Sequence, residues 1–250
     1  MPGHWRVVDG AAGALRIYET AASLGASAGG TIVFCHELPR DPDRSADSGR
    51  GYPALADRLS EECACRVIVP MLRGTSGSAG DFSAKGWLDD MSRVVDAEAG
   101  LGKGVWLIGF GLGGAIALRT AASDVRVSGV ASIAGPADLT AWTSNREKVL
   151  ERCRRSGVIS TEGYPPDLDT WAAEIVALAP LDAASHLGAR PLLVVHGSDD
   201  SEVPVAAARA VSDAATDGPV DLRIVPAAGH WLRADPRVVA TLVGWIERHR

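Results

Sequence analysis

The alternation of short apolar runs with helical patterns constrains this chain more than any other feature. Eight such runs recur along its 250 residues, at 6–9, 15–20, 31–35, 66–70, 105–110, 127–133, 191–195 and 221–225. From residue 31 onward they are almost continuously apolar, which is typical of parallel strands covered on both faces. The first two runs are less uniform, and we expect them to pair as an antiparallel leader to the sheet.

Helical spacing of apolar residues fills the intervals between these runs. It predicts helices over about 51–62, 84–98, 113–122, 204–215 and 236–248. Repeated strand and helix indicate an α/β fold, with an eight-stranded, mostly parallel sheet and helices on both faces. The length and a hydrophobic content of 46% favour a single domain over residues 1–250.

One long stretch, at about 136–188, interrupts this rhythm and is too long for a plain connection. Its segment NREKVLERCRRSG predicts a charged helix that ends at Gly157, and YPPDLDTW leads to a second helix over about 168–178. We interpret the insert as a small lid. Its apolar residues are expected to roof a pocket, and would favour an interaction module if exposed: Val149, Leu150, Trp171 and Ile175.

Composition and charge exclude several classes of function. The net charge of -6 is spread without long runs of one sign, which argues against a nucleic-acid partner. No window approaches the ~18 apolar residues of a membrane span, and no secretory signal pattern is present. The four cysteines are too few for a disulfide framework or a zinc site. We expect a cytoplasmic protein that binds a small molecule, without metal or other cofactor; a homodimer stays open.

A glycine-rich turn follows the fifth run. VWLIGFGLGG places a strand before Gly109–Gly114 and a helix after it, which is the context of a nucleophile elbow. The sharp turn needs small residues two positions either side of its centre, and Gly109 and Gly113 meet this need. The spacing also approximates a dinucleotide-binding loop. That alternative is disfavoured because about five strands precede the turn and no acidic residue ends the next strand.

Two later loops complete a catalytic order of elbow, acid and histidine. HGSDDSEVP (196–204) follows the seventh run, and PAAGHWLRADP (226–236) follows the last. With these loops the chain resembles the α/β-hydrolase superfamily of serine esterases and peptidase-like enzymes. The resemblance implies that Asp200 is the acid, with Asp199 as its rival, and that His230 is the catalytic histidine. It places Gly111 at the position of the nucleophilic serine.

The resemblance extends to His36-Glu37-Leu38-Pro39, which is similar to the H-G-x-P loop after the third strand of the family. It implies an oxyanion hole formed by the backbone N–H groups of Leu38 and Leu112. Glu37 replaces the family's glycine. Its carboxylate would oppose negative charge on a substrate oxygen, unless it points to solvent or pairs with Arg40.

Gly111 closes the usual acyl-enzyme route, because loss of the nucleophile removes most of the rate. A relocated nucleophile is a less favoured alternative, with four candidates: Cys35, Ser76, Ser78 and Ser132. The interpretation we favour is a pseudo-hydrolase that binds a small acyl or ester-like ligand. Two others stay open. One is a hydrolase or lyase in which the Asp200–His230 dyad activates water, and the other is an esterase or peptidase-like enzyme inactivated by an artificial Ser→Gly change.

Overall fold

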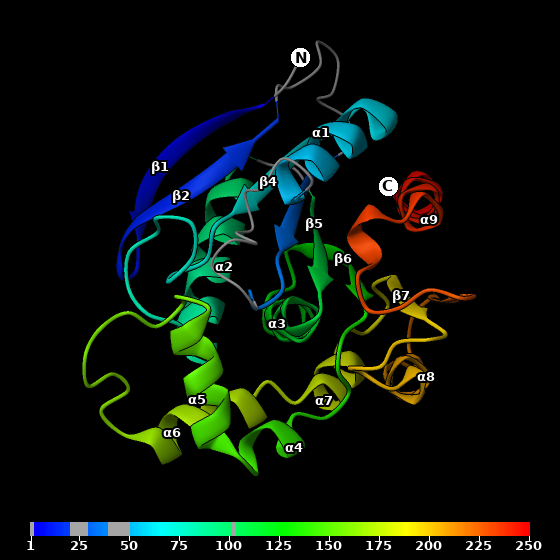
Figure 1. The fold of residues 1–250 in the computed structure, drawn as a ribbon. Coiled ribbons are helices and arrows are strands. Elements are labelled where there is room, and N and C mark those ends of the chain that lie inside the picture. Colours follow the sequence, from blue (N-terminus) through cyan, green and yellow to red (C-terminus); the bar gives the residue numbers. More distant parts are fainter. Residues whose placement is uncertain (1–2, 21–29, 40–50, 102–103) are drawn as a thin grey trace.

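The computed structural model describes residues 3–20, 30–39, 51–101 and 104–250, and it contains one eight-stranded sheet (Figure 1). The strands are β1 (His4–Gly10), β2 (Gly13–Glu19), β3 (Thr31–Cys35), β4 (Arg66–Pro70), β5 (Val105–Phe110), β6 (Val127–Ile133), β7 (Leu192–Gly197) and β8 (Val220–Val225). Their order is β1-β2-β4-β3-β5-β6-β7-β8. The pairs β1–β2 and β2–β4 are antiparallel and all others are parallel, which confirms the expected sheet and its antiparallel leader.

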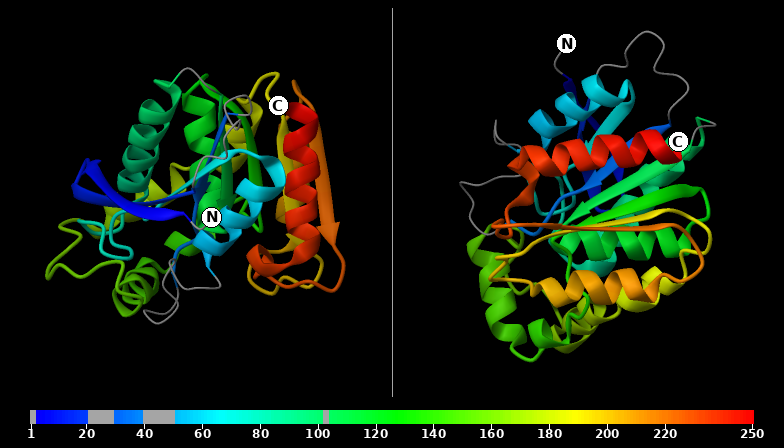
Figure 2. Two further views of the ribbon diagram at one scale, coloured as in Figure 1. Left: turned by 90° about the horizontal axis from the view of Figure 1, so that it is seen from above. Right: turned by 90° about the vertical axis from the view of Figure 1, so that its right-hand side faces the viewer.

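Helices cover both faces of the sheet, as predicted. On one face α1 (Tyr52–Cys63) and α9 (Pro236–His249) lie side by side, as Figure 2 shows. The other face carries α2 (Ala84–Ala99), α3 (Leu112–Ser123) and α8 (Val205–Ala214). Alternate residues of each strand feed the two cores. In β3, for example, Ile32 and Phe34 face the α1–α9 side, whereas Val33 and Cys35 face the other.

The insert between β6 and β7 contains four short helices, gathered on the side of the molecule away from α1 and α9 (Figure 1). They are α4 (Thr140–Thr143), α5 (Arg146–Arg155), α6 (Leu168–Val176) and α7 (Pro180–Ser185). The helices α5 and α6 were expected, and Gly157 follows α5 with a φ of 77°. The helices α4 and α7 were not predicted from the sequence.

The four apolar residues expected to roof a pocket, Val149, Leu150, Trp171 and Ile175, do not line it, so that expectation was wrong. Trp171 and Ile175 are 2% and 1% exposed, and Val149 and Leu150 pack half-buried against the same core. The indole N–H of Trp171 also donates to the carbonyl of Phe82 at 3.0 Å. These side chains anchor the insert to the body of the protein. No helix in the described parts of the chain is long and apolar enough to cross a membrane.

Candidate active site

The turn between β5 and α3 has the backbone of a nucleophile elbow. Its central residue, Gly111, has a φ of 52° and a ψ of -125°, a conformation that residues with a side chain rarely adopt. A Cβ on Gly109 would lie 2.2 Å from the carbonyl oxygen of Gly113, and one on Gly113 would lie 2.2 Å from that of Cys35. Close backbone approach therefore requires both flanking glycines.

The space beside Gly111 is shared by two other residues. A Cβ built on Gly111 would lie 3.0 Å from Cβ of Glu37 and 3.3 Å from its Oε2. The Cβ built on Gly111 would also lie 3.6 Å from Nε2 of His230. A side chain at this position would thus emerge between Glu37 and His230, and Glu37 already occupies part of the room that a serine needs.

Asp200, and not Asp199, is the carboxylate that the structure brings to His230. The side chain of Asp200 is fully buried, and its Oδ1 accepts the backbone N–H groups of Glu202 at 2.9 Å and Val203 at 3.0 Å. Its Oδ2 lies 2.8 Å from Nδ1 of His230. Asp199 instead accepts the hydroxyl of Ser198 at 2.6 Å. The turn after β7 therefore holds the carboxylate in place by contacts that do not involve His230.

A second histidine, His196, supports this carboxylate and was not identified from the sequence. It is buried at the end of β7, and its Nε2 lies 2.9 Å from the carbonyl oxygen of Val203 and 3.1 Å from Oδ2 of Asp200. The only signal for it is its place at the start of the HGSDD segment. His196 braces the loop that carries Asp200.

The contact with Asp200 sets the tautomer of His230. A carboxylate only accepts, so Nδ1 of the neutral ring carries the proton and Nε2 carries the lone pair. Nε2 lies 3.8 Å from Oε2 of Glu37 and 3.9 Å from Oε2 of Glu202. Both distances exceed a hydrogen bond. The lone pair therefore faces a space flanked by two carboxylates.

Glu37 points inward, so the expectation that it faces solvent was wrong. Its side chain is 13% exposed, and Oε1 accepts from the guanidinium of Arg233 at 3.0 Å. Its backbone N–H donates to the hydroxyl of Tyr52 at 3.0 Å. Arg40, the partner suggested by the sequence, lies outside the described residues. Arg233 belongs to the short 3-10 helix η3 (Leu232–Ala234), and its place three residues after His230 was the only sequence signal for it.

The neighbouring His36 holds the loop that carries Glu37. Its Nδ1–H donates to the carbonyl oxygen of Glu37 at 2.9 Å, and its Nε2 accepts the N–H of Leu72 at 3.0 Å. Burial lowers the pKa of His36 from 6.5 to about 4, because the charged ring would lose its hydration. At neutral pH the ring is uncharged, as its two opposite hydrogen-bonding roles require.

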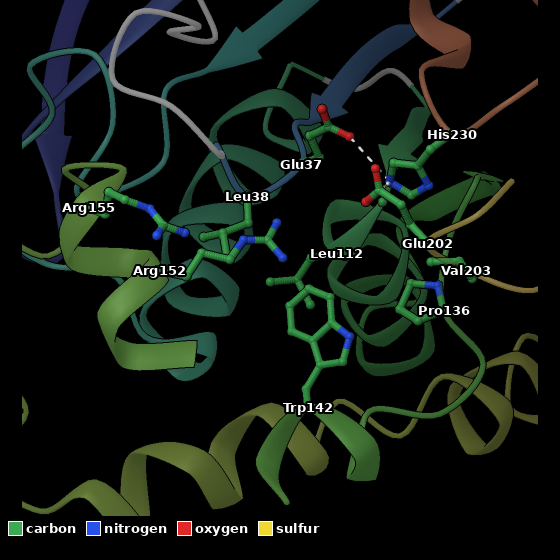
Figure 3. Close-up of a pocket in the computed structure, with 11 residues that line it drawn as sticks. Glu37, Leu38, Leu112, Pro136, Trp142, Arg152, Arg155, Glu202, Val203 and His230 are labelled. Carbon is green, nitrogen blue, oxygen red and sulfur yellow. Dashed lines mark ion pairs between the residues drawn. The ribbon is translucent and has the colours of Figure 1, made fainter. Parts of the chain in front are cut away.

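These groups border a pocket of about 470 Å³, drawn in Figure 3. Its lining consists of Glu37, Leu38, Gly111, Leu112, Pro136, Trp142, Arg152, Arg155, Glu202, Val203 and His230. Five of these are site residues named from the sequence, and Asp200 lies behind His230. The insert contributes Pro136, Trp142, Arg152 and Arg155, none of which was identified from the sequence. A lid was inferred there, but its pocket-facing side chains were not.

A much smaller cavity adjoins the pocket on the side of Gly111. It has about 10 Å³ of space and is lined in part by Glu37, Gly111, His230 and Arg233. This is close to the room that one water molecule needs, and three of these residues offer polar atoms. Glu37, Gly111 and His230 line both this cavity and the main pocket.

The alternative nucleophiles do not lie at this site. Cys35 is fully buried, and burial raises the pKa of its thiol, which disfavours the reactive thiolate. Ser132 is 2% exposed, and neither it nor Ser76 nor Ser78 lines the pocket. Among the described residues, no group of three or more His, Cys, Asp or Glu side chains is placed to hold a metal ion.

Known proteins share this architecture. The model of the alpha/beta hydrolase family matches residues 32–242. The structure of DcsB in complex with its substrate analogue covers 99% of this chain and 100% of the DcsB chain, with 13% sequence identity and a TM-score of 0.73. The alpha/beta hydrolase GrgF from Penicillium sp. sh18 is 19% identical over 100% and 99% of the chains, with a TM-score of 0.71.

A thermophilic esterase from Thermogutta terrifontis is 21% identical over 99% of this chain and 100% of its own, with a TM-score of 0.68. At these identities the likeness concerns the fold alone. A comparison with curated protein sequences finds no match. The family match spans most of the chain and includes the elbow, the acid loop and His230. The chain therefore belongs to the alpha/beta hydrolase family.

Proposed function

We propose that this protein is a hydrolase that acts without a nucleophilic side chain, using His230 and Asp200 to activate a water molecule beside Gly111. The observation that carries the proposal is the orientation of His230: its Nδ1 contacts Asp200, and its Nε2 lies beside Gly111 and Glu37, which also border a water-sized cavity. A retained histidine–carboxylate pair with this orientation is what general-base catalysis requires. The pocket volume suits a small ester-like substrate.

In the proposed reaction, water gives one proton to Nε2 of His230 as its oxygen bonds to the carbonyl carbon of the substrate. Asp200 stabilises the imidazolium that forms. The carbonyl oxygen becomes an anion, to which the N–H groups of Leu38 and Leu112 would donate. Collapse of this intermediate breaks the bond to the leaving oxygen, which takes the proton from Nε2. An acid and an alcohol leave, and no covalent enzyme intermediate forms.

Glu37 fits this scheme as the second contact of the water. Its Oε2 and His230 Nε2 are 3.8 Å apart, so an oxygen beside both can hydrogen bond to each. The guanidinium of Arg233 offsets the negative charge of Glu37, which reduces its repulsion of an oxyanion. The side chain also needs the room that Gly111 leaves. This mutual fit favours a natural pairing of the two residues over an artificial Ser→Gly change.

A pseudo-hydrolase that only binds a small acyl or ester-like ligand is the second candidate. The observation in its favour is Gly111 itself, which has no side chain to attack a substrate. Among the described residues, no serine, threonine or cysteine lines the pocket. Glycine also relieves the backbone strain that a serine bears at this φ. The two candidates differ in whether His230 changes a reaction rate.

Hydrolysis of p-nitrophenyl acetate and butyrate tests the proposal, with the parent protein compared with His230→Ala and Glu37→Gln. We expect slow parental turnover without a burst, and a loss of about a hundredfold or more in His230→Ala. Mass spectrometry of the quenched protein should show no acyl adduct. Equal rates in the parent and a folded His230→Ala variant would rule out the proposed reaction and leave the binding candidate.

A further inference from the structure

We infer that the pocket binds an organic anion, whose carboxylate or phosphate group contacts Arg152 and Arg155 of the insert. The inference deepens the proposed function, on which it rests only for the placement of the reacting bond at His230. It assigns to the protein a substrate class: an ester that carries an acidic group at its far end.

Both arginines project from the same side of α5. They are three residues apart, so their side chains are neighbours on the helix surface. Arg152 is half-buried and Arg155 is exposed, and both line the main pocket. Figure 3 shows the two guanidinium groups extending from α5 toward Leu38, on the side of the pocket opposite His230. Two positive charges therefore form one wall.

Neither of these guanidinium groups has a carboxylate partner among the described residues. Other arginines of the same helix do have polar partners: Arg146 lies 2.6 Å from Asp169, and Arg154 donates to the carbonyl of Tyr164 at 3.0 Å. The guanidinium of Arg152 lies 5.6 Å from the ring centre of Trp142, a cation–π contact that favours its position in the pocket. A bound anion would supply the acceptors that both groups lack.

The opposite wall has the reverse charge, which gives the pocket a direction. Glu37 and Glu202 flank His230 and would repel an anionic group. Apolar side chains complete the lining. In Figure 3 Leu38 lies beside the two arginines, and Leu112 lies between the two walls. An amphiphilic acid would thus place its acidic group at the arginines and its apolar body at the leucines. A bond at its other end would then face His230.

Equilibrium binding of non-hydrolysable probes tests this inference, by calorimetry at low and high salt. The probes are 4-phenylbutyrate, 3-phenylpropyl phosphate and the neutral 4-phenyl-1-butanol. We expect both anions to bind about tenfold or more tightly than the alcohol, and the preference to fall as salt rises. Tighter binding of the phosphate than of the carboxylate would assign an organophosphate, and the reverse order a carboxylic acid. Equal binding of all three probes would overturn the inference.

Variants of α5 test whether Arg152 and Arg155 cause the preference for anions. The double variant Arg152→Gln, Arg155→Gln should bind the anions about as weakly as it binds the alcohol. Lys148→Gln removes an exposed positive charge from the same helix outside the pocket lining, and should leave the preference unchanged. Circular dichroism checks that each variant is folded. An anion preference that survives in the folded double variant would contradict the assignment of the two arginines.

The same probes separate this inference from the proposed hydrolysis. They contain no carboxylic ester, so their binding does not depend on the chemistry of His230. A His230→Ala variant that loses esterase activity and keeps the anion preference would support both statements. If the parent protein shows no His230-dependent turnover but keeps an arginine-dependent preference, the hydrolysis fails and the anion site stands. If the parent protein shows His230-dependent turnover but no anion preference, the hydrolysis stands and the anion site fails.

Discussion

The two halves of the site differ in how far they depart from a serine hydrolase. On the β7–β8 side, Asp200 and His230 have the contact that a catalytic triad needs. On the β3–β5 side the elbow backbone is present, but Gly111 stands where the family resemblance implies a serine, and Glu37 stands where it implies a glycine. Backbone geometry and side-chain chemistry can therefore vary separately at one site. The turn has the shape of an elbow with glycine at its centre.

The two halves are also held by different interactions. Buried hydrogen bonds to Asp200 fix the β7–β8 side. On the β3–β5 side, close backbone contacts around the elbow and the neutral ring of His36 fix the loops. The ion pair between Glu37 and Arg233, 196 residues apart in sequence, joins the halves. Variants can therefore weaken one half at a time.

The largest effect is expected for Asp200→Asn, which breaks the β7–β8 side chemically. The amide can still accept the N–H groups of Glu202 and Val203, but its NH₂ would face Nδ1 of His230 and favour the wrong tautomer. Ester hydrolysis should fall by about a hundredfold or more, as in His230→Ala, while the fold is kept. Steady-state kinetics and thermal unfolding measure the two quantities. An unchanged rate would show that this half has no catalytic role.

Gly109→Ala and Gly197→Ala test whether both halves depend equally on close backbone packing. Each new Cβ would lie 2.2 Å from a carbonyl oxygen, that of Gly113 in one case and of Ala228 in the other. Each variant should lose about 3 kcal/mol of unfolding free energy. Denaturant titration measures the loss.

Gly244→Ala is the matched control for these two variants. This glycine lies inside α9, and a Cβ added there would meet no atom within 4 Å. Alanine should stabilise the protein by about 0.5–1 kcal/mol, because it restricts the unfolded chain and favours the helix. If Gly109→Ala or Gly197→Ala is as stable as the parent, the backbone that the new Cβ approaches can shift. Close backbone packing would then not hold that half of the site in place.

Acid should weaken the β3–β5 side through His36. Its pKa is about 4 in the folded protein and near 6.5 in the unfolded chain, so the unfolded chain binds the proton first. Stability is complete above pH 6.5 and falls as the pH drops toward 4. The interval of about 2.5 pH units corresponds to about 3 kcal/mol.

The variant His36→Gln isolates this contribution from that of the carboxylates. It should be less stable than the parent at neutral pH, because it loses the ring contacts, but its stability should decline less between pH 6.5 and 4. Urea titrations at several pH values give both curves. Parallel curves would show that His36 does not titrate on unfolding in this range.

A smaller loss of stability than for Gly109→Ala is expected for Gly111→Ser, which brings the β3–β5 side back toward a serine hydrolase. Serine at this φ and ψ should cost about 1–3 kcal/mol of stability, and its Cβ would crowd Glu37. Adding Glu37→Gly should relieve the crowding. Only the double variant should then form an acyl-enzyme with p-nitrophenyl butyrate, in a manner that His230→Ala abolishes. An acyl-enzyme in the single variant would show that Glu37 moves aside easily.

Much of the fold could be predicted because its signals are local. The apolar runs and helical spacing gave the eight strands and the main helices, and the doublet Gly109 and Gly113 marked the elbow. The order of elbow, acid and histidine indicated Asp200 and His230, which the structure brings together. The short helices α4 and α7 escaped prediction, since tertiary packing stabilises helices of only a turn or so.

The sheet, the elbow turn and the glycine at its centre could be recognised from the chain alone, because they depend on residue size and on periodicity along the chain. The positions of the charges depend on tertiary packing. Glu37 turns inward because Arg233, distant in sequence, lies beside it, and Arg152 and Arg155 reach the pocket because the insert packs through Trp171 and Ile175. Charge pairing depends on distance in space, which no local pattern records.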